Sequence, residues 1–147
     1  MPAQTLSPSD LVEQPGTPET PVAAPASHGD PDLEAITGVW RNCDEETRGI
    51  LGMRLAVTPT GLTVRTQGNC TPTPCEWGEV PARAYATTVT ATEAIAFTAH
   101  YDHGFAERIV TGLLDEGTLI VETYVTFKDG TDRSPYHSRD YLCHRRG

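Results

Sequence analysis

Short stretches in which apolar and polar residues alternate follow one another along most of this chain, and turn residues separate them. Alternation with a period of two is typical of strands that bury one face. A Pro59-Thr60-Gly61 turn separates the second stretch from the third. We expect strands at about 38–43, 49–58, 62–66, 77–89, 94–102, 105–114, 118–128 and 134–144. Evenly spaced strands without a long helix predict an all-β fold, an eight-stranded antiparallel up-and-down barrel.

Glycine-containing turns predict how the last strands pair. His103-Gly104 and Glu116-Gly117 are expected to be two-residue hairpin turns, because glycine suits the second position. The expected opposite pairs are Tyr101 with Ala106, Ala99 with Arg108, Phe97 with Val110, Leu114 with Leu119, Gly112 with Val121, Val110 with Thr123, and Arg108 with Val125. One face then collects Ile95, Phe97, Val110, Leu114, Leu119, Val121, Val125 and Phe127. This face must be the inside, since a one-residue slip would expose all of these side chains.

Three other side chains fall on the same inner face, namely Tyr101, Arg108 and Thr123. An inward arginine needs a partner, a ligand or water, because burying an unpaired charge is costly. A third turn at Asp129-Gly130 would add Tyr136, Ser138 and Asp140 to this face, and Asp140 could then pair with Arg108. Such a pair inside a filled barrel is the alternative to a true pocket, since barrels of this size do either.

The candidate site follows from this inner face. We expect Tyr101 and Arg108 to be the catalytic residues, with one of them donating a hydrogen bond to a substrate carbonyl. The expected ligand-binding residues are Phe97, Val110, Thr123, Val125, Tyr136 and Trp77. No metal ligands and no cofactor are expected, because the chain has no P-loop, no Gly-x-Gly-x-x-Gly and no His-Glu-x-x-His. The cluster from His100 to His103 is expected on the outer face and in a turn, as a solvated strand end.

The start of the chain has a different composition from the rest. Its first 36 residues hold seven of the 12 prolines and six acids, and they contain no Lys, Arg, Cys or aromatic residue. Such a segment buries too little apolar surface to offset its ordering entropy. We therefore expect a flexible acidic arm over residues 1–30, either a lid or a solubilising tail, before a barrel domain over residues 31–147.

The net charge and the cysteines indicate which binding partners and which cellular compartment to expect. Removing the six acids of the first 36 residues from the net charge of −9 leaves −3, so nucleic acid and membranes are not expected partners. The chain lacks an apolar membrane span and a secretory leader, which predicts a cytoplasmic protein. Cys43 with Cys143, and Cys70 with Cys75, are then expected as reduced pairs; zinc is a weaker alternative, because Cys-x4-Cys has no second nearby pair.

The stretch Ile36-Thr37-Gly38-Val39-Trp40-Arg41-Asn42 resembles the first strand of avidins and the Gly-x-Trp block of lipocalins, which belong to the calycin group of barrels. The lipocalin resemblance implies that Trp40 closes one end of the barrel beneath a basic side chain, Arg145 or Arg146. Asn42 matches a biotin-binding asparagine of avidins, but the other biotin-contacting residues have no counterpart, so biotin binding is not expected.

Two further segments, Gly68-Asn69-Cys70-x-Pro72-x-x-Cys75-x-Trp77-Gly78 and Phe127-Lys128-Asp129-Gly130-x-x-Arg133-Ser134, resemble a family of small bacterial barrel domains without a settled function. The architecture is also similar to small calycin-like cyclases of natural-product pathways, although no catalytic residues match.

These observations predict a small-molecule-binding barrel. The leading expectation is a cofactor-independent cyclase or isomerase that acts on an apolar, polyketide- or polyene-like substrate in bacterial secondary metabolism, by ordering it in an apolar cavity. A non-catalytic carrier of a small apolar molecule and a filled barrel that acts as a protein-interaction module are the alternatives. The sequence leaves the oligomeric state open, with a homodimer as one expectation.

Overall fold

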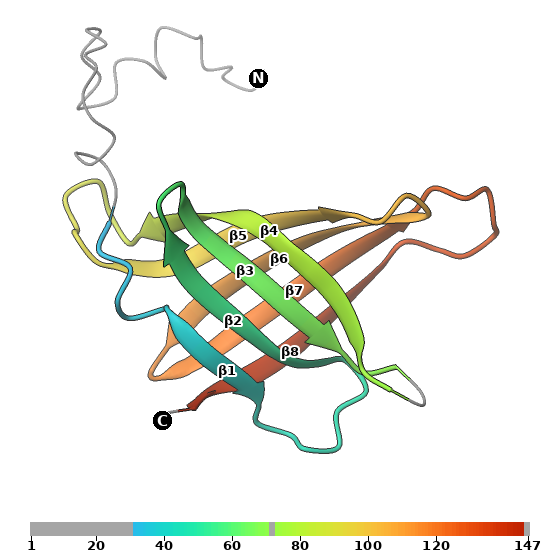
Figure 1. Cartoon of the computed structure of the whole chain (residues 1–147), viewed down its shortest axis with the longest axis horizontal. Coiled ribbons are helices and arrows are strands. Elements are labelled where there is room, and N and C mark those ends of the chain that lie inside the picture. The colour runs from blue at the N-terminus through green and yellow to red at the C-terminus, as the bar shows by residue number, and fades with distance from the viewer. Residues whose placement is uncertain (1–30, 71–72, 146–147) are drawn as a thin grey trace, which may run out of the picture. The chain divides into compact units, whose positions relative to one another are not determined.

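The computed structural model describes residues 31–70 and 73–145. Its strands are β1 (Gly38–Asn42), β2 (Ile50–Thr58), β3 (Gly61–Gly68), β4 (Cys75–Ala86), β5 (Ala94–Asp102), β6 (Ala106–Asp115), β7 (Thr118–Phe127) and β8 (Tyr136–Arg145). Each strand pairs antiparallel with the next, and β8 pairs with β1 to close the barrel (Figure 1). This confirms the predicted eight-stranded up-and-down barrel. The expected arm, residues 1–30, lies outside the described residues.

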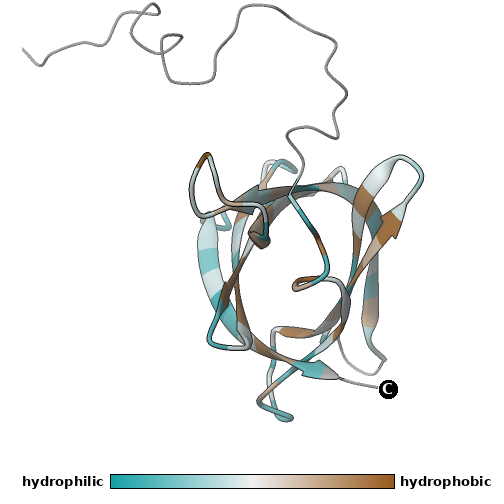
Figure 2. Ribbon diagram, turned by 90° about the vertical axis from the view of Figure 1, so that its left-hand side faces the viewer, coloured by the Kyte–Doolittle hydropathy of each residue, from teal (hydrophilic) through white to brown (hydrophobic). Residues whose placement is uncertain are grey.

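The barrel interior is the core of the protein. Phe97, Val110 and Val121 are completely buried, and the ring of strands is closed when viewed end-on (Figure 2). The predicted inner face is therefore correct for these residues. Ile95 differs, because the β4–β5 pairing is irregular at this point: Ala86 pairs with Ala94 and Tyr85 with Ala96. As a result Ala94 is fully buried, whereas Ile95 is only half-buried.

The β6–β7 hairpin has the predicted register. Leu114 pairs with Leu119, and Asp115 pairs with Thr118 across a two-residue turn. Both turn residues have positive φ, 55° at Glu116 and 85° at Gly117. This is the type I′ conformation, whose twist matches that of the flanking strands.

The β5–β6 hairpin has a different register from the predicted one. Tyr101 pairs with Arg108 instead of Ala106, so the pairing is shifted by two residues. The His103 backbone N–H donates to the Ala106 carbonyl at 2.9 Å, so the chain turns at Gly104-Phe105, one residue later than expected. The carboxyl group of Asp102 accepts a hydrogen bond from the Gly104 backbone N–H at 2.9 Å within this turn. Because the shift is an even number of residues, each side chain keeps its predicted face.

The β7–β8 connection is also longer than a two-residue turn and covers residues 128–135. Asp129 caps it, accepting hydrogen bonds from the backbone and side chain of Thr131 and pairing with Arg133. The predicted face is again retained. Asp140 pairs with Val121 and is buried on the inside.

One end of the barrel is closed by the segment before β1. A turn at residues 34–36 is held by backbone hydrogen bonds from Ile36 and Thr37 to the Leu33 carbonyl, and this segment lies across the ring in Figure 2. Trp40 is 1 % exposed, and its Nε1–H donates to the Ile36 carbonyl at 3.0 Å. The basic side chain over Trp40 is His144, stacked at a centroid distance of 4.3 Å. The role that the lipocalin resemblance implies for Arg145 or Arg146 is not tested, because the Arg145 side chain and the whole of Arg146 lie outside the described part of the chain.

Two disulfides correct the prediction of reduced cysteines. Cys43 is bonded to Cys143, and Cys70 to Cys75, with Cα–Cα distances of 5.3 and 5.4 Å. The first bond joins the end of β1 to β8 because barrel closure makes these strands neighbours. No helix among residues 31–70 and 73–145 is long and apolar enough to cross a membrane.

Candidate functional site: a polar cavity at the open end

A cavity of about 170 Å³ lies at the barrel end opposite Trp40. Its walls come from the β1–β2 and β3–β4 connections and from the inner faces of β4, β6, β7 and β8. Both cysteines of the Cys70–Cys75 disulfide belong to this wall, and Arg48 and Asn69 stand beside them. Thus the cavity joins segments that are far apart in the sequence.

Two polar side chains that face this cavity each have one atom without a hydrogen-bond partner among the described residues. Asp140 is 7 % exposed and Thr123 is 2 % exposed; Asp140 Oδ2 and Thr123 Oγ1 have no partner. The other carboxyl oxygen, Oδ1, accepts hydrogen bonds from Asn42 Nδ2 at 3.0 Å and from Thr47 Oγ1 at 3.4 Å. A buried polar atom left unpaired costs about 1–3 kcal/mol, so these two atoms are unusual in a native core.

The fold explains why Asp140 and Thr123 lie together. Thr123 pairs with Ser138 on β8, and Asp140 pairs with Val121 on β7, so all of them belong to one inward surface of the β7–β8 ladder. Gly49 leaves the space for the carboxyl group, because a Cβ at this position would lie 2.7 Å from Asp140 Oδ1. The loop before β2 and the interior of β8 are therefore fitted to each other.

Arg108 does not pair with Asp140, which corrects the pairing suggested by the sequence. Its Nη1–H donates to His103 Nδ1 at 2.8 Å, and its guanidinium lies 4.7 Å from the centre of the Trp77 ring. His103 Nε2 lies 3.3 Å from the Trp77 carbonyl and donates to it, because Nδ1 is the acceptor. Arg108 and His103 are only five residues apart in the sequence, so this contact is local. It holds the guanidinium charge at the cavity rim, over the aromatic face of Trp77.

Tyr101 is placed beside Arg108 as its cross-strand neighbour, but its hydroxyl points into the wall of the barrel. The side chain is 1 % exposed, and its hydroxyl lies 3.0 Å from Thr66 Oγ1, 3.0 Å from the Gly78 carbonyl and 3.2 Å from the Val64 carbonyl. Burial raises the pKa of this phenol above its usual value, so it remains a neutral donor at physiological pH. Here Tyr101 links β5 to β3 and β4 and does not line the cavity.

The other expected ligand-binding residues fall into two groups. Trp77, Thr123, Val125 and Tyr136 line the cavity together with Arg108. Phe97 and Val110 are completely buried deeper in the barrel, outside the cavity wall. Gly112 accommodates the Phe97 ring, since a Cβ there would overlap it.

The sequence did not identify Asp140, held by Asn42, as a candidate binding residue on the cavity wall. The alternation of β8 placed Asp140 inside the barrel, which was the available signal. Its Oδ1 atom accepts a hydrogen bond from Asn42, which is 98 positions away in the sequence. Only closure of β8 on β1 brings these two side chains together.

His100 and Asp102 lie on the outer surface, as expected, whereas His103 contacts Arg108 and Trp77 instead of forming part of a solvated strand end. His100 Nε2 lies 3.4 Å from a Glu107 carboxyl oxygen, and Lys128 Nζ lies 2.9 Å from Asp102. The hydrogen bond from Lys128 lowers the pKa of Asp102. Among the described residues, no group of three His, Cys, Asp or Glu side chains is placed to hold a metal ion.

Comparisons of the chain with protein-family models, with curated proteins and with solved structures returned no match. The closed antiparallel barrel is consistent with a calycin-like fold. Its function therefore has to be argued from the cavity itself.

Proposed function

We propose that this protein binds one small polar molecule in the cavity at the open end of the barrel. The observation that carries the proposal is the pair of buried, unpaired atoms, Asp140 Oδ2 and Thr123 Oγ1, on the cavity wall. A ligand that donates hydrogen bonds to them would remove the cost of leaving them unpaired. A filled barrel acting as an interaction module would gain nothing from this arrangement.

The walls of the cavity suggest which chemical groups the ligand carries. It has an N–H or O–H donor toward Asp140, and an acceptor toward the guanidinium of Arg108 at the rim. Trp77 and Tyr136 offer flat aromatic surfaces to the rest of the molecule. The volume of about 170 Å³ is below the roughly 300–1,000 Å³ of pockets for drug-sized ligands, so a compact molecule or one end of a larger one fits best.

Binding can be tested by ligand-observed NMR with compounds of about ten heavy atoms in three sets: ureas and amides with N–H donors, their N-methylated analogues, and hydrocarbons of equal size. We expect saturation transfer to members of the donor set, and its loss in Asp140→Asn, which replaces an acceptor oxygen by an amide. The control Asp115→Asn changes an exposed carboxyl outside the cavity and should keep the signal. Equal binding by the methylated set, or by Asp140→Asn, would contradict the proposal.

Catalysis by a cofactor-independent cyclase or isomerase is the second candidate, and the position of Arg108 favours it. A guanidinium at the rim of a partly apolar cavity can stabilise a carbonyl oxygen that gains negative charge. We prefer binding to catalysis for two reasons. The cavity is small for a polyketide- or polyene-like substrate. The Tyr101 hydroxyl is already hydrogen-bonded within the barrel wall. Turnover that survives Arg108→Gln unchanged would exclude this candidate.

The two disulfides bear on where the protein works. Disulfides persist in oxidising compartments and are rare in the cytosol, so we propose an oxidising location in place of the expected cytoplasmic one. This location can be tested by quenching cells with acid and measuring how many of the four cysteines react with an alkylating reagent in the lysate. Labelling of all four thiols without prior reduction would restore the cytoplasmic expectation.

A further inference from the structure

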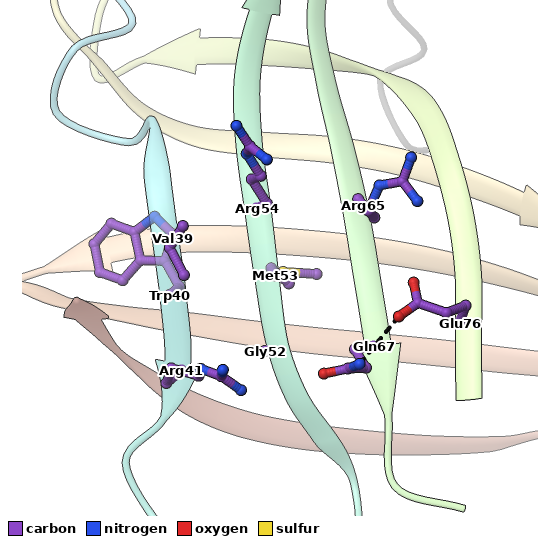
Figure 3. Close-up of a pocket in the computed structure, with 9 residues that line it drawn as sticks. All are labelled: Val39, Trp40, Arg41, Gly52, Met53, Arg54, Arg65, Gln67 and Glu76. Atoms are coloured by element: carbon purple, nitrogen blue, oxygen red, sulfur yellow. Dashed lines mark hydrogen bonds between the residues drawn. The ribbon is translucent and has the colours of Figure 1, made fainter. Parts of the chain in front are cut away.

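A second hollow, of about 180 Å³, lies on the outer surface of β1, β2 and β3, and its lining is drawn in Figure 3. Gly52 forms its floor, between Arg41 on β1 and Gln67 on β3, with which it pairs. The register of β2 shifts next to Gly52, and a Cβ here would lie 2.8 Å from the Trp40 carbonyl oxygen. Because glycine is required at this position, the outer row of side chains has a gap.

Three arginines line this hollow. Arg41 reaches toward it from β1, and Arg54 and Arg65 stand on the next row of β2 and β3 (Figure 3). Arg54 and Arg65 are directly opposite each other in the β2–β3 ladder. Like charges placed directly opposite destabilise a sheet, so this arrangement works against the fold.

Nearby carboxyl groups neutralise only part of this charge. Arg65 forms an ion pair with Glu79 at 3.4 Å, and Glu76 accepts a hydrogen bond from Gln67 at 3.0 Å. Arg41 and Arg54 have no ion pair with any residue in the described part of the chain. Both are exposed in a protein whose net charge is −9.

We propose that this hollow binds the dianionic head of a small phosphate monoester. Arginine is suited to such groups, since its planar fork donates two parallel hydrogen bonds to their oxygens. A doubly charged head between Arg54, Arg65 and Arg41 would relieve the repulsion within the sheet. Val39, 41 % exposed at the edge of the hollow, offers an apolar contact to the organic part of the ester.

The proposal is tested by 1H–15N correlation spectra of the whole protein titrated with three probes, namely phenyl phosphate, inorganic phosphate and phenol. Saturable shifts of the amides of β1, β2 and β3 are expected with phenyl phosphate, weaker ones with inorganic phosphate, and none there with phenol. Equal affinity for the two phosphates would instead assign the site to the free anion. Absence of saturable shifts with either phosphate, or equal shifts with phenol, would overturn the proposal.

Charge-neutral variants show whether the arginines carry the binding. In Arg54→Gln we expect at least tenfold weaker binding of phenyl phosphate, since a hydrogen bond to a charged group is lost. The control Arg83→Gln removes an exposed arginine of β4 that also lacks an ion pair with the described residues, and it should bind as the unmodified protein does. Loss of affinity in Arg83→Gln as well would reduce the effect to net charge and refute the site.

Discussion

The two ends of this barrel use buried polar groups in opposite ways. At the closed end, the buried indole N–H of Trp40 is paired with the Ile36 carbonyl, and a ring from β8 stacks on it. At the open end, Asp140 and Thr123 are also buried, but each keeps an atom without a partner. A satisfied group stabilises the fold, whereas an unsatisfied one lowers stability unless a ligand completes it. This difference is the reason why we propose the open end, and not the closed end, as the binding site.

The two disulfides also differ, in the length of chain that they close. Cys43–Cys143 spans 100 positions and fixes β1 against β8, while Cys70–Cys75 spans five and closes a loop at the cavity. In the chain-entropy description, stabilisation grows with the length of the closed loop. The long-range bond should therefore contribute to the whole barrel, and the short one mainly to the local shape of the cavity wall.

The largest expected effect comes from removing the long-range disulfide. The double variant Cys43→Ser/Cys143→Ser should lose about 4–5 kcal/mol of unfolding free energy, and Cys70→Ser/Cys75→Ser about 2 kcal/mol. Urea unfolding followed by circular dichroism measures both values, and the unmodified protein with reductant is the control. Equal losses in the two double variants would mean that loop length does not distinguish the disulfides.

Tryptophan substitutions compare the packing of the two ends. Trp40→Ala should cost about 3–5 kcal/mol, because it leaves a cavity in a fully buried position and an unpaired Ile36 carbonyl. Trp77→Ala should cost only about 1–2 kcal/mol, since Trp77 is half-buried at the cavity rim. Urea midpoints with unchanged slopes would measure the difference. A larger cost for Trp77→Ala would show that the open end carries more of the stability than its exposure indicates.

Two threonine substitutions test the unpaired atoms directly. Thr66 and Thr123 are both buried and face inward, but only Thr66 has a hydrogen bond, with Tyr101. Thr123→Val should raise the unfolding free energy by about 0.5–1 kcal/mol and weaken ligand binding, whereas Thr66→Val should lower the unfolding free energy by about 1 kcal/mol. Thermal unfolding of both variants decides the point. A loss of stability in Thr123→Val would mean that its hydroxyl is satisfied in solution.

The last expected effect concerns Tyr101 and is most distinctive at alkaline pH. Burial raises its pKa in the folded protein, so its contribution to stability is complete below the unfolded value of about 10 and falls as the pH rises above it. Tyr101→Phe should cost about 0.5–1.5 kcal/mol at pH 7 and show a shallower loss of stability above pH 10. Phenolate absorbance should show one tyrosine that ionises late and is missing in Tyr101→Phe. Ligand binding should be unchanged in this variant, because Tyr101 stabilises the fold and does not line the cavity.

The pattern of the sequence was sufficient for the fold and for the direction of most side chains. Strand alternation has a period of two, so an error of two residues in the β5–β6 pairing left Tyr101 and Arg108 on the inner face. The β6–β7 register was predicted to the residue, because Glu116-Gly117 adopts the one turn type that local chemistry favours. Strand alternation and turn type both depend on residues that are close together in the chain, so they can be predicted from the sequence.

The partners of the inward polar groups were decided only by the tertiary structure. The sequence suggested that Arg108 and Asp140 pair with each other. In the structure Arg108 contacts His103 and Trp77. Asp140 accepts a hydrogen bond from Asn42 of β1. Alternation says that a side chain points inward, but it does not say how far along the barrel axis each group lies or what stands opposite. The closure of β8 on β1 sets those positions, and with them the unpaired oxygen of Asp140 that defines the candidate site.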